Sequence, residues 1–156
     1  MSDITAIAAF KDNYIWCLRQ AELALIVDPG DATAVQQHLQ QHQLKLAVIL
    51  ITHHHPDHTG GIQDLKQRWP DAVVYAPALE QDKIPYADVW LEDNQQIELA
   101  NFNLSFQVMQ LPGHTLVILP TIQRPFCFVV ILYLTQVVVD CLRARQRRCG
   151  KVCHAF

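Results

Sequence analysis

Residues 52–61 read Thr-His-His-His-Pro-Asp-His-Thr-Gly-Gly, and the rest of the 156-residue sequence is organised around them. The very apolar run 46–51 ends where the histidines begin, which predicts a turn at the end of a buried strand. Imidazole nitrogens and carboxylate oxygens are the ligands that a borderline-soft divalent metal prefers. A solvated polar loop is the plain alternative, but four histidines and an aspartate within six residues favour a metal site.

The spacing within this stretch indicates two metal ions. In an extended segment His53 and His55 point the same way, because side chains alternate with period two. Asp57 and His58 come one turn later and can face a second point in space. One short loop could therefore supply two ligands to each of two neighbouring metals.

Charge and cysteine content divide the chain into two parts. The apolar fraction of 51% and the length suit a single domain with a proper core, and the net charge of −3 indicates no particular partner. Residues 1–115 carry six Lys/Arg and fourteen Asp/Glu, whereas residues 116–156 carry six Lys/Arg and one Asp. Four of the five cysteines also lie in residues 116–156. The two parts are therefore interpreted separately.

The compartment is predicted to be the cytoplasm. The N-terminus has no basic region and no long apolar segment, which argues against a signal peptide. Cys17 is the only cysteine in residues 1–115, so no disulfide framework is expected there. The apolar-rich run 126–139 is shorter than the about 20 residues that a membrane-spanning helix needs.

The periodicity of residues 1–115 predicts an α/β domain. Strands are expected at 4–9, 14–18, 23–27, 46–51, 72–76, 97–99 and 102–109, the first three forming a meander. A helix capped by Asp31 is expected to run to about residue 42, with Val35 and Leu39 on its inner face. A second helix is expected after residue 61, because apolar residues recur at 62, 65 and 69. The stretch 77–94 is expected to be irregular apart from a helical turn near 79–83.

The motifs resemble a known family. Residues 52–58 match the pattern Thr-His-x-His-x-Asp-His of hydrolases with the metallo-β-lactamase fold. Three stretches closely resemble sequences of the glyoxalase II family, the hydroxyacylglutathione hydrolases. They are Phe-Lys-Asp-Asn-Tyr-Ile-Trp at 10–16, the histidine-rich sequence at 53–61 and Leu-Pro-Gly-His-Thr at 111–115. The resemblance covers residues 3–115. It implies a fold that is the N-terminal half of a metallo-β-lactamase αββα sandwich, here truncated.

The resemblance also assigns roles to residues. His53, His55 and His114 are similar to the ligands of one metal, and Asp57 and His58 to ligands of a second. His54 is expected to pack or bond locally rather than bind metal. For Asp28 two interpretations stay open: a residue that supports the ligands, or a simple turn cap.

The implied chemistry is thioester hydrolysis. A water between two divalent cations, Zn²⁺ first and iron or manganese as alternatives, loses its proton near neutral pH and attacks the carbonyl without a protein base. The implied substrate is an S-(2-hydroxyacyl)glutathione such as S-D-lactoylglutathione, and the products are glutathione and D-lactate, a step in methylglyoxal detoxification. The expected partner is this small molecule, with no nucleic acid, no membrane and a monomeric chain.

Residues 116–156 depart from the family. The family has a metal-bridging Asp in a Gly-Asp-Thr motif, a later His and a C-terminal helical domain, and neither Asp140 nor His154 lies in a matching context. Codons for Val-Ile-Leu-Pro-Thr at 117–121 can be regrouped, with one added base, to encode Gly-His-Ile-Ala-Tyr, which is how the family continues. We therefore interpret 1–115 as the N-terminal part of a metallo-β-lactamase-like domain and 116–156 as an out-of-frame tail. The second metal site is then incomplete.

Three functions remain open from the sequence. The first is the glutathione thioester hydrolase. The second is another hydrolase of the same fold, acting on a β-lactam or a nucleic acid. The third is an inactive frameshifted fragment.

Overall fold

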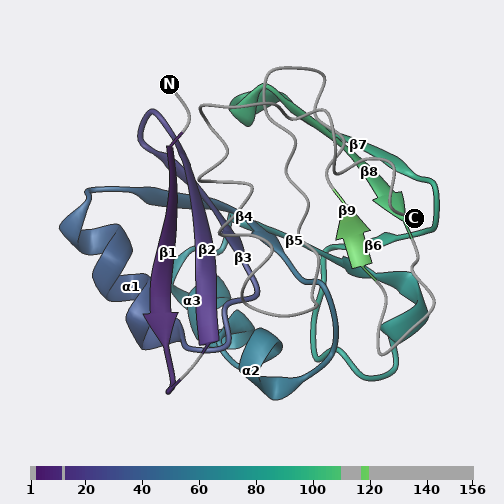
Figure 1. Cartoon of the computed structure of the whole chain (residues 1–156), viewed down its shortest axis with the longest axis horizontal. Helices are drawn as coiled ribbons and strands as arrows, with labels where there is room; N and C mark the ends of the chain where they lie inside the picture. The colour runs from purple at the N-terminus through teal and green to yellow at the C-terminus, as the bar shows by residue number, and fades with distance from the viewer. Residues whose placement is uncertain (1–2, 12, 110–116, 120–156) are drawn as a thin grey trace, which may run out of the picture.

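The computed structural model describes residues 3–11, 13–109 and 117–119, and its elements form two sheets and a set of helices (Figure 1). The first sheet contains six strands: β1 Asp3–Ala9, β2 Asn13–Gln20, β3 Leu23–Val27, β4 Lys45–Leu50, β5 Val73–Pro77 and β6 Val89–Leu91. They lie side by side in chain order. β1, β2 and β3 form the predicted antiparallel meander, whereas β3, β4, β5 and β6 run parallel to one another.

The helices connect the parallel strands. α1 (Ala32–Gln41) joins β3 to β4, and α2 (Pro56–Thr59) and α3 (Ile62–Arg68) join β4 to β5. α1 begins as predicted, because the Asp31 side chain accepts hydrogen bonds from the backbone N–H groups of Thr33 and Ala34. α2 was not predicted. It is a single turn that begins at Pro56, whose fixed φ suits the first helical position.

The second sheet lies apart from the helices, towards the upper right of Figure 1. It contains β7 (Gln96–Leu99), β8 (Leu104–Met109) and β9 (Val117–Leu119), all antiparallel, with the short 3₁₀ helix η2 (Ala100–Phe102) between β7 and β8. A second 3₁₀ helix, η1 (Ala78–Glu80), follows β5. Strand β6 was also not predicted; it falls in the stretch expected to be irregular, and η1 lies beside the predicted helical turn.

Two hydrophobic cores lie on opposite faces of the six-stranded sheet. In β3, Ala24 and Ile26 belong to the core that α1 and α3 cover, whereas Leu25 and Val27 belong to the core shared with β7, β8 and η2. Both faces of the parallel strands are therefore buried, which explains why 23–27 and 46–51 are apolar throughout. The layers run helix, sheet, sheet, which agrees with the expected N-terminal half of an αββα sandwich.

Within the described residues, no helix is both long and apolar enough to cross a membrane. The predicted features of 120–156 and His114 lie outside the described residues.

Candidate metal centre

The histidine loop leaves the sheet at the end of β4, between β3 and β5. The N–H of Ile51 makes a last sheet-type hydrogen bond to the carbonyl of Tyr75, at 2.9 Å. The next amide, that of Thr52, donates instead to Oδ1 of Asp28 at 2.8 Å, and the Thr52 hydroxyl donates to Oδ2 at 2.6 Å. Asp28 follows β3, so a buried carboxylate from the neighbouring strand fixes the point where the loop begins.

Glycines allow the two loops to touch through their backbones. A Cβ atom on Gly30 would lie 1.8 Å from the carbonyl oxygen of Asp57, and one on Gly61 would lie 2.4 Å from that of Pro29. The N–H of Gly61 donates to the same Pro29 carbonyl at 2.8 Å. The Asp-Pro-Gly turn at 28–30 is therefore packed directly under the loop that carries the candidate ligands.

His53 and His55 form the first candidate pair. Nε2 of His53 and Nδ1 of His55 lie 3.1 Å apart, so the two rings face one point as the alternation predicts. His53 is only 4% exposed. Its other nitrogen, Nδ1, lies 3.0 Å from the Thr52 hydroxyl, which orients the ring.

Asp57 and His58 form the second candidate pair. Oδ2 of Asp57 lies 3.3 Å from Nε2 of His58, and Nδ1 of the same ring lies 3.1 Å from Oδ2 of Asp28. The amide of Asn13, at the start of β2, donates to Oδ2 of Asp57 at 2.6 Å. The two pairs adjoin, because the His53 and His58 ring centroids are 3.9 Å apart.

The charges of this cluster shift its ionisation. Burial, aided by repulsion from His58, lowers the pKa of His53 to about 4. Burial also acts to lower the pKa of His58, but the carboxylates of Asp28 and Asp57 outweigh it and raise that pKa. Burial acts to raise the pKa of Asp57, but the Asn13 hydrogen bond and the charge of His58 hold it below its usual value. A neutral His53 and an ionised Asp57 are the forms that bind a metal.

His54 faces a different carboxylate. Its backbone N–H donates to Oε2 of Glu80 at 2.7 Å, and its ring Nδ1 lies 3.1 Å from the same oxygen. His54 therefore contacts a carboxylate 26 residues away, and its exclusion from the metal ligands stays a prediction. Its partner, Glu80, is the last residue of η1, which directly follows β5.

The donor set fits a divalent metal. Two imidazole nitrogens on one tetrahedral Zn²⁺ lie about 3.3 Å apart, given Zn–N bonds of about 2.0–2.1 Å, and the His53–His55 pair is close to this. The buried Nδ1 of His58 makes no hydrogen bond, although the Asp28 carboxylate is adjacent. Donor atoms of Asp28, His53 and His58 all lie within 4.8 Å of one another. Imidazole nitrogens and carboxylate oxygens this close together are a donor set that suits a divalent cation.

The structure thus brings together four of the five predicted ligands, His53, His55, Asp57 and His58. The fifth, His114, lies outside the described residues, so its role stays a prediction. For Asp28 the turn-cap interpretation is wrong, because its side chain bonds Thr52 across 24 residues rather than its own turn.

Asn13 and Glu80 are site residues that the sequence interpretation missed. Asn13 lies in the 10–16 motif that resembles the family, which was a usable signal. Glu80 lies in an acidic stretch without periodicity, and its contact with His54 joins residues 26 positions apart.

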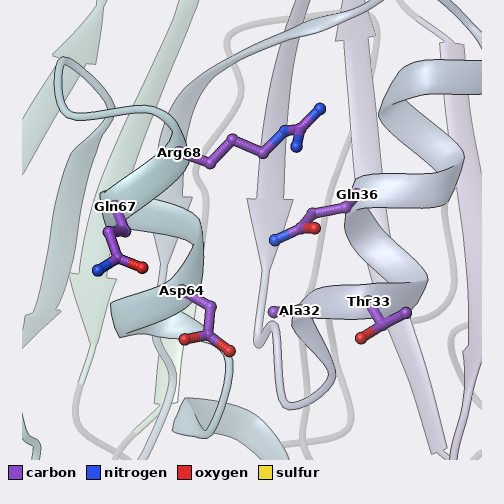
Figure 2. A pocket seen from close by; sticks show the side chains of 6 residues that line it. All are labelled: Ala32, Thr33, Gln36, Asp64, Gln67 and Arg68. Carbon is purple, nitrogen blue, oxygen red and sulfur yellow. The ribbon is translucent and has the colours of Figure 1, made fainter.

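A separate pocket of about 350 Å³ lies between α1 and α3. Figure 2 shows Arg68 of α3 and Gln36 of α1 reaching into the space between the two helices. The residues that line the pocket are Ala32, Thr33, Gln36, Asp64, Gln67 and Arg68. None of the predicted metal ligands lines it, so it is not part of the candidate metal centre.

Comparison with known proteins agrees with this geometry. The model of the metallo-beta-lactamase superfamily matches residues 11–129. Hydroxyacylglutathione hydrolases of Methylobacillus flagellatus and Vibrio cholerae are 47% identical over 115 residues and 46% identical over 117 residues. Each match covers 74% of this chain and 45% of the relative, so the chain spans under half the length of these curated relatives.

Solved structures share the fold. The BLEG-1 B3 metallo-beta-lactamase superposes with a TM-score of 0.67 at 24% identity, over 78% of this chain and 68% of that one. ETHE1 from Myxococcus xanthus superposes with a TM-score of 0.58 at 22% identity, over 78% of this chain and 53% of that one. At this identity the likeness shows the fold alone.

Proposed function

The chain belongs to the metallo-beta-lactamase superfamily, and from this premise we propose that it is the N-terminal part of a hydroxyacylglutathione hydrolase. The substrate class would be S-(2-hydroxyacyl)glutathione thioesters, with S-D-lactoylglutathione as the first candidate. The products would be glutathione and a 2-hydroxy acid such as D-lactate, which would place the reaction in methylglyoxal degradation. The names and the 47% and 46% identities of the two hydrolases support this substrate class.

The observation that carries the proposal is the pairing of ligands on one loop. Two adjacent pairs of side chains, His53 with His55 and Asp57 with His58, lie on the loop that follows β4. This arrangement suits two metal ions held side by side. When bound, such ions supply Lewis acidity, which lowers the pKa of water and polarises a carbonyl group.

The protein's own residues would orient these ligands. We assign His53, His55 and His114 to one metal and Asp57 and His58 to the other. The Asp28 carboxylate lies 3.1 Å from Nδ1 of His58, and Nε2 of the same ring is directed towards Asp57. Asn13 fixes the Asp57 carboxylate, so this oxygen is already oriented before a metal binds.

The finer details of the proposal extend the family's chemistry to this chain. Zn²⁺ is the first candidate metal, with iron or manganese as alternatives, and the chain acts as a monomer on a small molecule, without nucleic acid or membrane. The free, buried Cys17 suits the reducing cytoplasm. Residues 1–115 form the metallo-β-lactamase-like part, and residues 116–156 are an out-of-frame tail.

A single experiment tests the activity. The gene is sequenced across codon 116, and the chain as written is compared with a frame-restored chain for turnover of S-D-lactoylglutathione, nitrocefin and RNA. We expect the frame-restored chain to hydrolyse the thioester only. His55→Ala should lower its kcat/KM more than about 100-fold, which exceeds the usual effect of residues outside the ligand set.

His42→Ala is the matched control, because His42 is an exposed histidine at the end of α1. It should leave kcat/KM unchanged. Hydrolysis of nitrocefin or RNA in place of the thioester would contradict the proposal. An intact gene that encodes residues 116–156 as written would contradict the frameshift.

The second candidate is an inactive fragment of that enzyme. The observation that favours this candidate is coverage, because the match spans only 45% of the length of the Methylobacillus flagellatus hydrolase. The chain as written should then bind metal through the histidine loop yet show no thioester turnover, while the frame-restored chain shows both.

A further inference from the structure

The backbone of the histidine loop has lost its sheet partners. Beyond Ile51 the chain no longer pairs with β5, so each buried N–H needs another acceptor. Thr52 finds one in Asp28, and His54 finds one in Glu80. Two carboxylates from different elements thus replace the sheet at alternate residues, on either side of His53.

Glu80 is held in place for this contact. Its carbonyl accepts hydrogen bonds from the N–H groups of Lys83 at 2.9 Å and Ile84 at 3.0 Å, so the turn that carries it is closed. The residue is 7% exposed. Among the described residues, no Lys or Arg forms an ion pair with it. A carboxylate buried in this way costs free energy unless its neighbours compensate the charge.

The neighbours of Glu80 belong to the metal loop. The His54 amide, 2.7 Å from Oε2, is part of the peptide that joins His54 to His53, and the next residue is His55. A rotation of that peptide would turn His53 and His55 relative to each other, because both rings are attached on either side of it. The 3.1 Å separation of their facing nitrogens therefore depends on a fixed peptide plane.

We propose that Glu80 is a positioning residue of the metal centre, which fixes the peptide before His54 so that His53 and His55 face one metal ion. This inference rests on the proposed function, since it requires that the loop bind metal. It adds a residue from η1 to a site otherwise built from β2, the turn after β3, the loop after β4 and α2.

The test compares Glu80→Ala and Glu80→Gln with the matched control Glu98→Gln, an exposed carboxylate on β7. Three quantities are measured on the full chain. They are the hydrogen exchange rate of the His54 amide without metal, the affinity for Co²⁺, and the visible absorption spectrum of bound Co²⁺. Glu80→Ala should speed His54 exchange at least about tenfold and weaken Co²⁺ binding about 10- to 100-fold. It should also alter the Co²⁺ spectrum, because the two imidazoles are no longer fixed.

Glu80→Gln keeps an acceptor oxygen and should restore most of both properties, whereas Glu98→Gln should change neither. If Glu80→Ala does not fold, Glu80→Asp takes its place, because its shorter carboxylate cannot reach His54. Glu80→Asp is then compared with Glu80→Gln in the same measurements. Wild-type Co²⁺ affinity and spectrum in folded Glu80→Ala would overturn the positioning role while the proposed function stands. Absence of Co²⁺ binding in the wild-type chain would overturn the proposed metal site and this role with it.

Discussion

Asp28 combines two roles at one residue. Its φ of 54° lies in the left-handed region, which Asp adopts more readily than most residues. This backbone turn ends β3 and directs the side chain inward, where it accepts two hydrogen bonds from Thr52 and contacts His58. Local strain at a residue that touches a functional group is a recurrent feature of active sites.

The hydroxyl of Thr52 should therefore contribute to stability. Thr52→Val keeps the shape but removes the 2.6 Å hydrogen bond to the buried Asp28 carboxylate. We expect the free energy of unfolding to fall by about 1.5–3 kcal/mol, the usual range for a hydrogen bond to a charged group. Urea denaturation monitored by circular dichroism measures the change.

Thr5→Val is the matched control, because Thr5 is exposed on β1. It should change the free energy of unfolding by less than about 0.5 kcal/mol. Equal effects of the two substitutions would show that the Asp28 contact contributes nothing specific.

At the scale of elements, Lys66 joins α3 to the strands beside it. Its Nζ donates to the carbonyls of Pro70 and Ala72 and to the carboxylate of Asp88. Asp88 also accepts hydrogen bonds from the N–H of Val74 in β5 and from the Tyr86 hydroxyl. This cluster fixes the turn between α3 and β5 to the segment that leads into β6.

The Asp88 cluster should make stability depend on acid pH. Burial acts to raise the pKa of Asp88, but the hydrogen bonds from Tyr86, Val74 and Lys66 outweigh it and lower the pKa. A lowered pKa in the folded state means that stability is present above the unfolded pKa, about 3.9, and is lost as pH falls through the folded pKa. Asp88→Asn removes this charge, so the variant should be less stable than wild type at pH 7.

The expected loss at pH 7 is below about 1 kcal/mol, because Asp88 lies at the protein surface, where solvent screens its charge. Thermal denaturation of both proteins across pH 2 to 7 measures it, and the difference in Tm should close at the acid end. A Tm difference that stays constant with pH would contradict the role of the charge. Asp71→Asn is the control, since Asp71 is an exposed carboxylate nearby.

Elements whose signals are local were predictable. The start of α1 follows from the Asp31 side chain, which caps its own helix. Strand β6 could not be predicted, because its three residues become a strand only through pairing with β5, at Tyr75↔Val89 and the two pairs that follow. α2 is a single turn of four residues, too short to show a period of 3.6.

At the scale of the whole molecule, the layered fold puts the loop where three segments meet. The turns after β3 and β4 and the helix η1 after β5 all lie at the carboxyl ends of neighbouring parallel strands. Because these ends share one edge of the sheet, side chains from distant segments converge there. This explains why Asp28 and Glu80, from two other segments, can both contact the histidine loop.

Metal binding should therefore stabilise the whole chain. Zn²⁺ at about 100 times its Kd should raise the free energy of unfolding by about 2.7 kcal/mol if it binds only the folded state. Thermal denaturation with Zn²⁺ and with a chelator measures this. The shift should vanish in His53→Ala and persist in His42→Ala.

The number of metals bound is a second readout of the same titration. The chain as written should hold fewer than two Zn²⁺ ions by elemental analysis, because it lacks the bridging Asp that the family resemblance implies. Two full equivalents would show that the second site is complete without that residue.

The sequence by itself determined the fold class and most of the strands, and it predicted the candidate ligands within 52–58, because these signals lie in residues close together in the chain. Alternation fixes that His53 and His55 face one way, and apolar runs fix which strands are buried on both faces. Only the tertiary structure decided what holds those ligands. Asn13, Asp28 and Glu80 contact Asp57, Thr52 and His54 across 44, 24 and 26 residues, and contacts of that span arise from the packing of neighbouring strands in the sheet rather than from any local pattern.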